Sequence, residues 1–228
     1  EDQDGNYLNR IISSIREKKV AGVGSPTASL ESNYALEKLV GKGNFYHGVA
    51  ADEFSLVKAA TDMMRSGAFH SPSLREIEQS DAILVLGEDL ADAPRLALSI
   101  RQAARNKAFD IAEKAGVAPW HDTAVRDLTI DIYSPLFIIS PAQTIVDEVA
   151  EWKQISANEE TINLGKAIDD ALGGKPSGKE SDKAQNEVAE RIAHTLSSAK
   201  RPVIVTGIKN KDLRILQSAA NIVKALST

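Results

Sequence analysis

The sequence contains no cysteine among its 228 residues. Without a thiol the chain cannot form a disulfide, use a thiolate as a nucleophile, ligate an iron–sulfur cluster through sulfur or build a cysteine-type zinc site. Long apolar runs are also missing, since the longest, at 82–86, is far shorter than the ~20 residues that cross a bilayer. The acidic first residues do not resemble a signal peptide. We therefore expect no direct membrane insertion.

The sequence has fewer basic than acidic residues: 27 Lys and Arg against 32 Asp and Glu give a formal net charge of −5. A chain of this charge is poorly suited to neutralising phosphates, so nucleic acid is not an expected partner. The four histidines lack metal-ligand spacing, and no Gly-x-Ser-x-Gly nucleophile motif occurs. Neighbouring carboxylates diverge on a helix or strand. We expect neither a catalytic residue nor a metal site.

What the sequence does contain is an alternation of short apolar and long amphipathic segments. Strands are predicted at 20–24, 44–49, 81–87, 136–139 and 203–205. The segment 81–87 is continuously apolar, which is typical of a parallel strand with both faces covered. The pattern predicts an α/β fold of the Rossmann-like kind, with a doubly wound, mostly parallel sheet and helices on both faces.

Local signals place several helix ends. Ser29 is expected to cap the helix that begins at residue 30, and Ser71 to begin a short helix at 72–79. Pro141 is expected to open the first of two helices that together span 142–172, because apolar residues recur there at helical spacing.

Composition divides the chain into three parts. Residues 1–172 are predicted to form the Rossmann-like domain, and 173–181, rich in Gly and Lys, a flexible linker. The helix–strand–helix unit at 182–228 either joins the first sheet or begins a second α/β domain. The first residue is not Met, and no strand follows the last β-α unit, so we expect a piece of a longer protein.

Two glycine-rich segments are imperfect nucleotide-binding motifs. Segment 22–27 (Gly-Val-Gly-Ser-Pro-Thr) begins like a dinucleotide fingerprint, but Thr27 replaces the third glycine and Pro26 lacks the N–H that would bind a pyrophosphate. Segment 173–180 matches the P-loop pattern until Glu180 replaces the Ser or Thr that ligates Mg²⁺. A tight turn and a solvated linker are the favoured interpretations, with an independent nucleotide-binding module as an alternative.

Two further segments, read together, resemble the molybdopterin oxidoreductase superfamily. They are 24–36 (Gly-Ser-Pro-Thr-Ala-Ser-Leu-Glu-Ser-Asn-Tyr-Ala-Leu) and 77–87 (Ile-Glu-Gln-Ser-Asp-Ala-Ile-Leu-Val-Leu-Gly). The continuation at 88–103 is similar to the G-subunit family of bacterial NADH:quinone oxidoreductase, respiratory complex I. The match is close over residues 22–106 and looser, though collinear, to the end. The resemblance implies a Rossmann-like domain C-terminal to the parts of the parent whose cysteines hold iron–sulfur clusters.

In doubly wound folds, ligands bind beyond the carboxyl ends of the strands, which directs attention to the loops after Gly24, Val49, Gly87 and Gly207. Superfamily enzymes place a small polar residue and Asn-Pro in the loop that here holds Glu88 and Asp89. Each carboxylate would oppose a cofactor phosphate by about 1 kcal/mol at 4 Å even in bulk water. The resemblance thus implies a degenerate, cofactor-free cleft formed by Gly24, Ser25, Pro26, Gly87, Glu88 and Asp89.

The resemblance also sets the expected biological context. It implies a non-catalytic structural and docking segment whose partners are other peripheral-arm subunits, on the cytoplasmic side of the inner membrane. The parent enzyme would pass electrons from NADH through iron–sulfur clusters to quinone and translocate protons. The alternative is a fragment of a molybdopterin-dependent oxidoreductase such as formate dehydrogenase.

Overall fold

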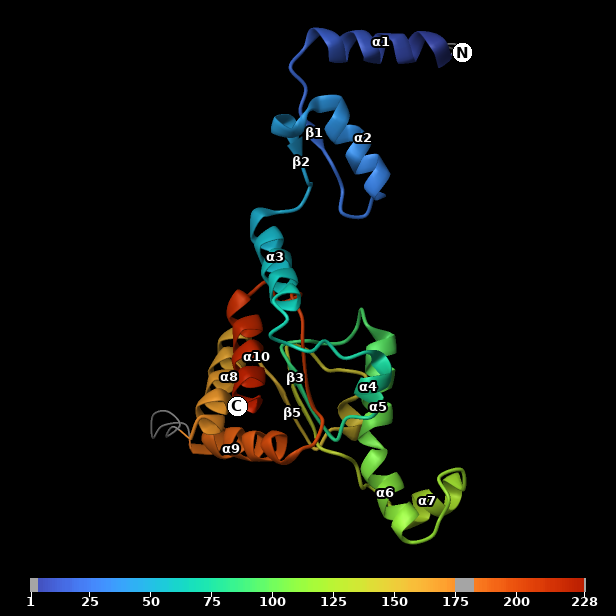
Figure 1. Ribbon diagram of the computed structural model, residues 1–228, viewed down its shortest axis with the longest axis vertical. Helices are drawn as coiled ribbons and strands as arrows, with labels where there is room; N and C mark the ends of the chain where they lie inside the picture. Colours follow the sequence, from blue (N-terminus) through green and yellow to red (C-terminus); the bar gives the residue numbers. More distant parts are fainter. Residues whose placement is uncertain (1–3, 175–182, 228) are drawn as a thin grey trace. The chain divides into compact units, whose positions relative to one another are not determined.

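A computed structural model describes residues 4–174 and 183–227 (Figure 1). The chain forms two compact units, Glu1–Ser55 and Leu56–Thr228. The boundary falls inside one helix, α3 (Ala51–Arg65). In the described part of the chain, no helix is both long and apolar enough to cross a membrane.

The first unit contains a small β-α-β arrangement. Strands β1 (Gly22–Val23) and β2 (Phe45–Tyr46) pair in parallel around α2 (Leu30–Val40). As predicted, the Ser29 hydroxyl caps α2 by accepting a hydrogen bond from the N–H of Ser32 at 3.2 Å. An apolar strand is expected to be buried, but Val23 is 69% exposed because β1 and β2 form a sheet of two strands.

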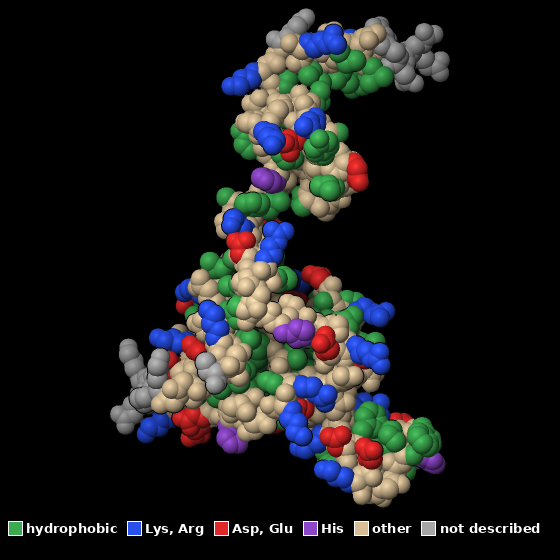
Figure 2. All heavy atoms as spheres, viewed as in Figure 1, with side chains coloured by type: hydrophobic (Ala, Val, Ile, Leu, Met, Phe, Trp, Pro, Cys, Tyr) green, Lys and Arg blue, Asp and Glu red, His purple; other side chains and the backbone are tan. Residues whose placement is uncertain are grey.

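Besides the first turn of α3, the first unit contains two other described helical segments. Helix α1 (Asp4–Glu17) is amphipathic, and η1 (Lys42–Asn44) is a single 3₁₀ turn before β2. Hydrophobic side chains gather on one side of α1 and are exposed there (Figure 2), with Tyr7 61% and Leu8 58% accessible. Tertiary packing within this unit therefore leaves the apolar face of α1 open.

The second unit holds the main sheet. After α3 its elements are, in chain order, α4 (Leu74–Glu78), β3 (Ala82–Leu86), α5 (Pro94–Ala104), α6 (Asn106–Lys114), α7 (Asp122–Leu128), β4 (Leu136–Ser140), η2 (Asp147–Val149), β5 (Trp152–Ile155), α8 (Asn158–Leu172), α9 (Lys183–Ser198), β6 (Pro202–Thr206) and α10 (Leu213–Leu226).

The four strands lie in the order β5-β4-β3-β6 and all run parallel. Leu84, at the centre of β3, is opposite Phe137 on β4 and Ile204 on β6. Alternate β3 side chains point to opposite faces. Leu84 and Leu86 pack with α8, α9 and α10, while Ile83 and Val85 pack with α4 and α5 (Figure 1). The predicted α/β fold, with a parallel sheet and helices around it, is confirmed.

The prediction was wrong between residues 141 and 157. Pro141 opens no helix there. Instead the chain forms the 3₁₀ turn η2 and then strand β5, which pairs with β4, and α8 begins only at Asn158. Ile145, Val149 and Trp152 are spaced as on a helix, but β5 alternates half-buried and exposed side chains, as expected of an edge strand with one covered face.

The cap of α4 also differs from the prediction, since Ser73 and not Ser71 begins this helix. The Ser73 hydroxyl accepts from the N–H of Glu76, and the Glu76 carboxylate accepts from the N–H of Ser73 at 2.7 Å, forming a capping box. This N–H, together with the Ser73 hydroxyl and His70, lowers the pKa of Glu76 to about 2. Pro72 therefore precedes the cap residue Ser73, and Leu74 occupies the first helical position.

The C-terminal helix–strand–helix segment contributes its strand to the same sheet, because β6 pairs with β3 along its whole length. Most of the predicted linker at 173–181, and most of the P-loop-like segment 173–180, lies outside the described residues. The division of the chain into 1–172, 173–181 and 182–228 stays a prediction.

Candidate functional site

The strand order places a topological switch point where the carboxyl ends of β3 and β6 meet. The chain leaves β3 toward β4 and β5 and returns to β6 on the other side of β3. At such a reversal the connections diverge to opposite faces of the sheet, and doubly wound proteins bind ligands there. The two loops involved are 87–92 after β3 and 207–210 after β6, and we call their junction the switch-point crevice.

Gly87 lets these loops approach closely. Its φ is +73°, a conformation that favours glycine. A Cβ at this position would lie 2.7 Å from Ile215 Cγ2 and 2.9 Å from Asn210 Nδ2. The Asn210 side-chain amide donates a hydrogen bond to the Gly87 carbonyl, and Asn158 in turn donates to the Asn210 carbonyl at 3.1 Å. The two loops are thus joined by direct polar contacts.

Glu88 occupies the part of the crevice where an anionic ligand would be expected. Its Oε1 accepts from the backbone N–H groups of Asp89 at 3.2 Å and Leu90 at 3.3 Å. Its carboxylate also lies against Gly207, where an added Cβ would overlap it. Successive backbone N–H groups in a turn form a common phosphate-binding device. Here the Glu88 carboxylate accepts the hydrogen bonds of these N–H groups in place of a phosphate.

Asp89 links the loop after β3 to the loop after β6 through an ion pair with Lys209. Its Oδ1 accepts from the N–H of Ala91 at 3.0 Å, and Lys209 Nζ lies 3.0 Å from both Asp89 and Asp92. The Ala91 N–H, followed by the Lys209 ammonium, lowers the pKa of Asp89, and the two carboxylates raise the pKa of Lys209. Together with Glu88, these carboxylates outweigh the positive charge of Lys209. The crevice therefore disfavours a further anion.

The pKa shift of Asp89 predicts a pH-dependent effect of Asp89→Asn. An ionised Asp89 stabilises the fold above the unfolded-state pKa of about 3.9, and this contribution disappears as the pH falls through the lower folded-state pKa. The variant should therefore melt at a lower temperature than the parent chain at pH 7, with the difference vanishing at strongly acidic pH. Thermal melts across this range, with Asp127→Asn at an exposed position of α7 as the charge control, test this. A pH-independent difference would contradict it.

The other predicted loop, with Gly24, Ser25 and Pro26, belongs to the first unit and follows β1. The Asn33 side chain accepts from the Ser25 N–H at 3.1 Å and donates to the Ser25 carbonyl at 2.9 Å. Gly24 N–H donates to the Tyr46 carbonyl at 2.8 Å. Pro26 has no N–H to offer. The N–H groups of Gly24 and Ser25 therefore already donate hydrogen bonds to acceptors within the chain.

The structure brings Gly87, Glu88 and Asp89 together with Gly207 in the second unit, whereas Gly24, Ser25 and Pro26 lie in the first. A shared cleft of the six predicted residues stays a prediction. Sequence reasoning pointed to the loop after Gly207 but missed Lys209, Asn210 and Asn33. Across the described residues, no group of three or more His, Asp or Glu side chains could hold a metal ion.

Comparisons with known proteins identify related sequences. No family model matches the chain. Proteins named as the G subunit of NADH-quinone oxidoreductase are 41% identical over 221 residues in Pseudomonas putida, 39% over 221 residues in Pseudomonas fluorescens and 40% over 215 residues in Escherichia coli K12. These alignments cover 92–96% of this chain and 24% of each relative, so the chain spans about a quarter of the relatives' length. The resemblance seen in the sequence is confirmed: the chain is homologous to a quarter-length segment of the G subunit of bacterial NADH-quinone oxidoreductase.

Proposed function

We propose that the chain is part of the G subunit of an NADH-quinone oxidoreductase and acts there as a structural and docking segment that binds no cofactor. The observation that carries the proposal is the occupation of the switch-point crevice by Glu88. Its carboxylate takes the two loop N–H groups that a cofactor phosphate would need, and it covers Gly207, where the backbone would otherwise be open to a ligand.

The wider context follows from the homology. The parent enzyme would carry electrons from NADH through iron–sulfur clusters to quinone and translocate protons, with the clusters in an N-terminal part of the G subunit. Partners would be other subunits of the peripheral arm, on the cytoplasmic side of the inner membrane. Because this chain has no cysteine, its contribution would be to hold and dock the electron-carrying parts and not to relay electrons itself.

The alternative, a fragment of a molybdopterin-dependent oxidoreductase such as formate dehydrogenase, requires space and positive charge for a pyrophosphate. At the switch point the Lys209 ammonium is shared between Asp89 and Asp92. A phosphate would have to displace Glu88 and compete with two carboxylates for this cation, which costs free energy at each step. The geometry thus favours the cofactor-free role.

The proposal is tested in the complete enzyme by introducing Glu88→Gln. This variant keeps the side-chain shape and removes the charge, so assembly and turnover with NADH and quinone should remain at the parent level. Analysis of the purified complex should find no molybdenum, tungsten or pterin assigned to this segment. Loss of turnover in a fully assembled Glu88→Gln enzyme, or stoichiometric pterin in the parent enzyme, would contradict the non-catalytic role.

A further inference from the structure

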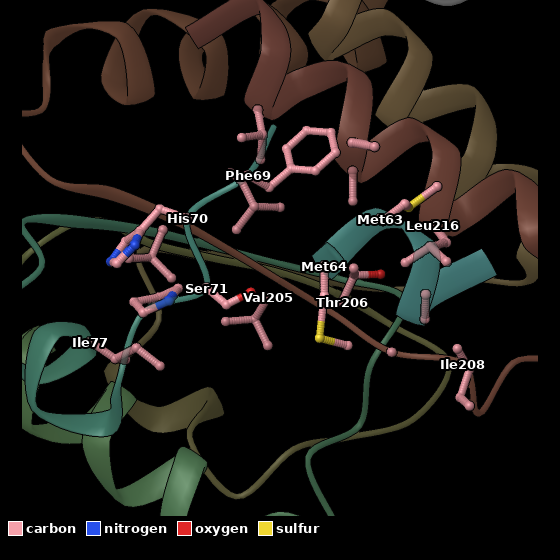
Figure 3. Close-up of a pocket in the computed structure, with 18 of the residues that line it drawn as sticks. Met63, Met64, Phe69, His70, Ser71, Ile77, Val205, Thr206, Ile208 and Leu216 are labelled. Carbon is pink, nitrogen blue, oxygen red and sulfur yellow. The ribbon is translucent and has the colours of Figure 1, made fainter. Parts of the chain in front are cut away.

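The outer edge of β6 borders a groove. β6 is the last strand of the sheet, and within the described residues its second edge faces no other strand. Two adjoining cavities of about 480 and 400 Å³ follow it from Lys200 to Ile208. Both are lined by Phe69, His70 and Pro72 from the connection between α3 and α4, and Figure 3 shows Phe69 and His70 in the larger one. The groove therefore runs along the whole strand.

The walls of the groove continue the two helix layers of the fold. On one side lie Leu216, Ala219 and Val223 of α10, and on the other lie Ile77 of α4 and Leu96 of α5. Met63 and Met64, the only methionines in the chain, line the same cavity (Figure 3). Methionine side chains adapt readily to an apolar partner. The larger cavity thus has the layered, apolar surroundings of a position inside a doubly wound sheet, whereas the smaller one is also lined by Glu76, Lys200 and Arg201 near the start of β6.

The two edges of the sheet differ in a way that points to an occupant. β5, at the opposite edge, carries Lys153 and Gln154, and a charged residue is a usual protection for an open edge. β6 reads Pro-Val-Ile-Val-Thr and has no charged residue. Its apolar run Val203-Ile204-Val205 is that of an interior strand, and Pro202 stands at the first position, where a strand tolerates the missing N–H. Beyond Pro202, the edge of β6 therefore lacks the charged side chain that protects the edge of β5.

Thr206 supplies an independent sign of a missing partner. Its Oγ1 is buried from solvent and has no hydrogen-bond partner in the described structure, and the residue lines the groove. Buried hydroxyls are normally hydrogen-bonded. A backbone group lying beside the carboxyl end of β6 would give this oxygen a partner.

We propose that an extended segment, apolar where it passes the larger cavity, pairs with the outer edge of β6 as a fifth strand of this sheet. We assign that segment to the part of the G subunit outside the present chain, and this assignment rests on the function proposed above. The relatives are about four times as long as the aligned region, so three quarters of such a protein is available to supply it. The N–H and C=O groups of β6 that face away from β3 would bind its backbone.

The absence of native cysteine in this chain allows a direct test by thiol labelling. Met64→Cys places a thiol in the groove, where Met64 is 62% exposed. Ser197→Cys, at an exposed position of α9, is the control. Maleimide labelling of each residue is followed by mass spectrometry in the 228-residue chain and in the isolated, complete G subunit. In the complete protein, Met64→Cys should react about tenfold or more slowly than in the chain, with Ser197→Cys unchanged.

Hydrogen exchange distinguishes strand pairing from other coverage. The amides of β6 should exchange more slowly in the complete G subunit than in the chain alone. The proposal would be overturned if Met64→Cys were labelled equally fast in the chain and in the complete G subunit, or if the exchange of the β6 amides were the same in both. It would also be overturned if protection arose only when other subunits join. A dimer of the 228-residue chain that protects Met64→Cys would do so as well, since a second copy would then be the occupant. Failure of the complete protein to assemble into an NADH-quinone oxidoreductase would instead refute the proposed function.

Discussion

Replacing Leu84 with Asp should leave residues 56–228 unfolded. Leu84 has no exposed surface, and its strand is flanked by β4 and β6, so an aspartate there could not reach water. A buried, unpaired carboxylate costs several kcal/mol, and the lost leucine burial adds about 2 kcal/mol. Their sum is comparable to the whole stability of a domain, about 5–15 kcal/mol.

The matched control is Leu98→Asp, the same substitution on α5 at a side chain that is 49% exposed. Circular dichroism and thermal melts should show a cooperative transition for Leu98→Asp and none for Leu84→Asp. A Leu84→Asp protein that remains soluble and melts at the parent temperature would mean that β3 is not the central strand.

Gly87→Ala should destabilise the second unit by about 2–4 kcal/mol. Part of this, about 1 kcal/mol, comes from forcing a side chain into the left-handed backbone region at φ +73°. The remainder, about 1–3 kcal/mol, comes from the overlap of the new methyl group with Ile215 and Asn210, which must move apart. The contact between the loops after β3 and β6 would be loosened as a result.

Gly116→Ala separates these two contributions. Gly116 has φ +77°, but a Cβ there would meet no atom within 4 Å, so only the backbone term of about 1 kcal/mol applies. Urea unfolding of the two variants, with equal m-values, gives the comparison. Equal destabilisation by both would show that the loops do not pack as tightly at Gly87 as the structure indicates.

The parts of the fold that could be predicted from the sequence are those with a local signal. The continuous apolar run of β3, the cap at Ser29 and the β-α alternation each reflect a physical requirement of nearby residues. β5 lacked such a signal. Its first residue, Trp152, continues the helical spacing of Ile145 and Val149, and only the pairing of β5 with β4, a tertiary interaction, makes it a strand.

In the candidate site, too, some residues could be recognised from a local sequence pattern and others could not. Glu88 and Asp89 could be recognised because they directly follow an evident strand. Lys209 and Asn210 reach the same loop only because β6 lies beside β3, and strand order is not encoded in any local pattern. No local pattern marks the boundary of the two compact units either, since α3 is helical on both sides of Ser55 and only the packing changes.

The pairing of β3 with β6 has a consequence for how the protein folds during synthesis. Asp81 contacts Arg201, 120 residues further along the chain, whereas β4 and β5 become available much earlier. Closing so long a loop is slow, and β6 cannot pair until the ribosome has released it. In that interval the uncharged edge of β3 would stand open beside a growing chain and be a site for aggregation. We therefore expect the newly made protein to depend on chaperones until residues 202–206 have emerged.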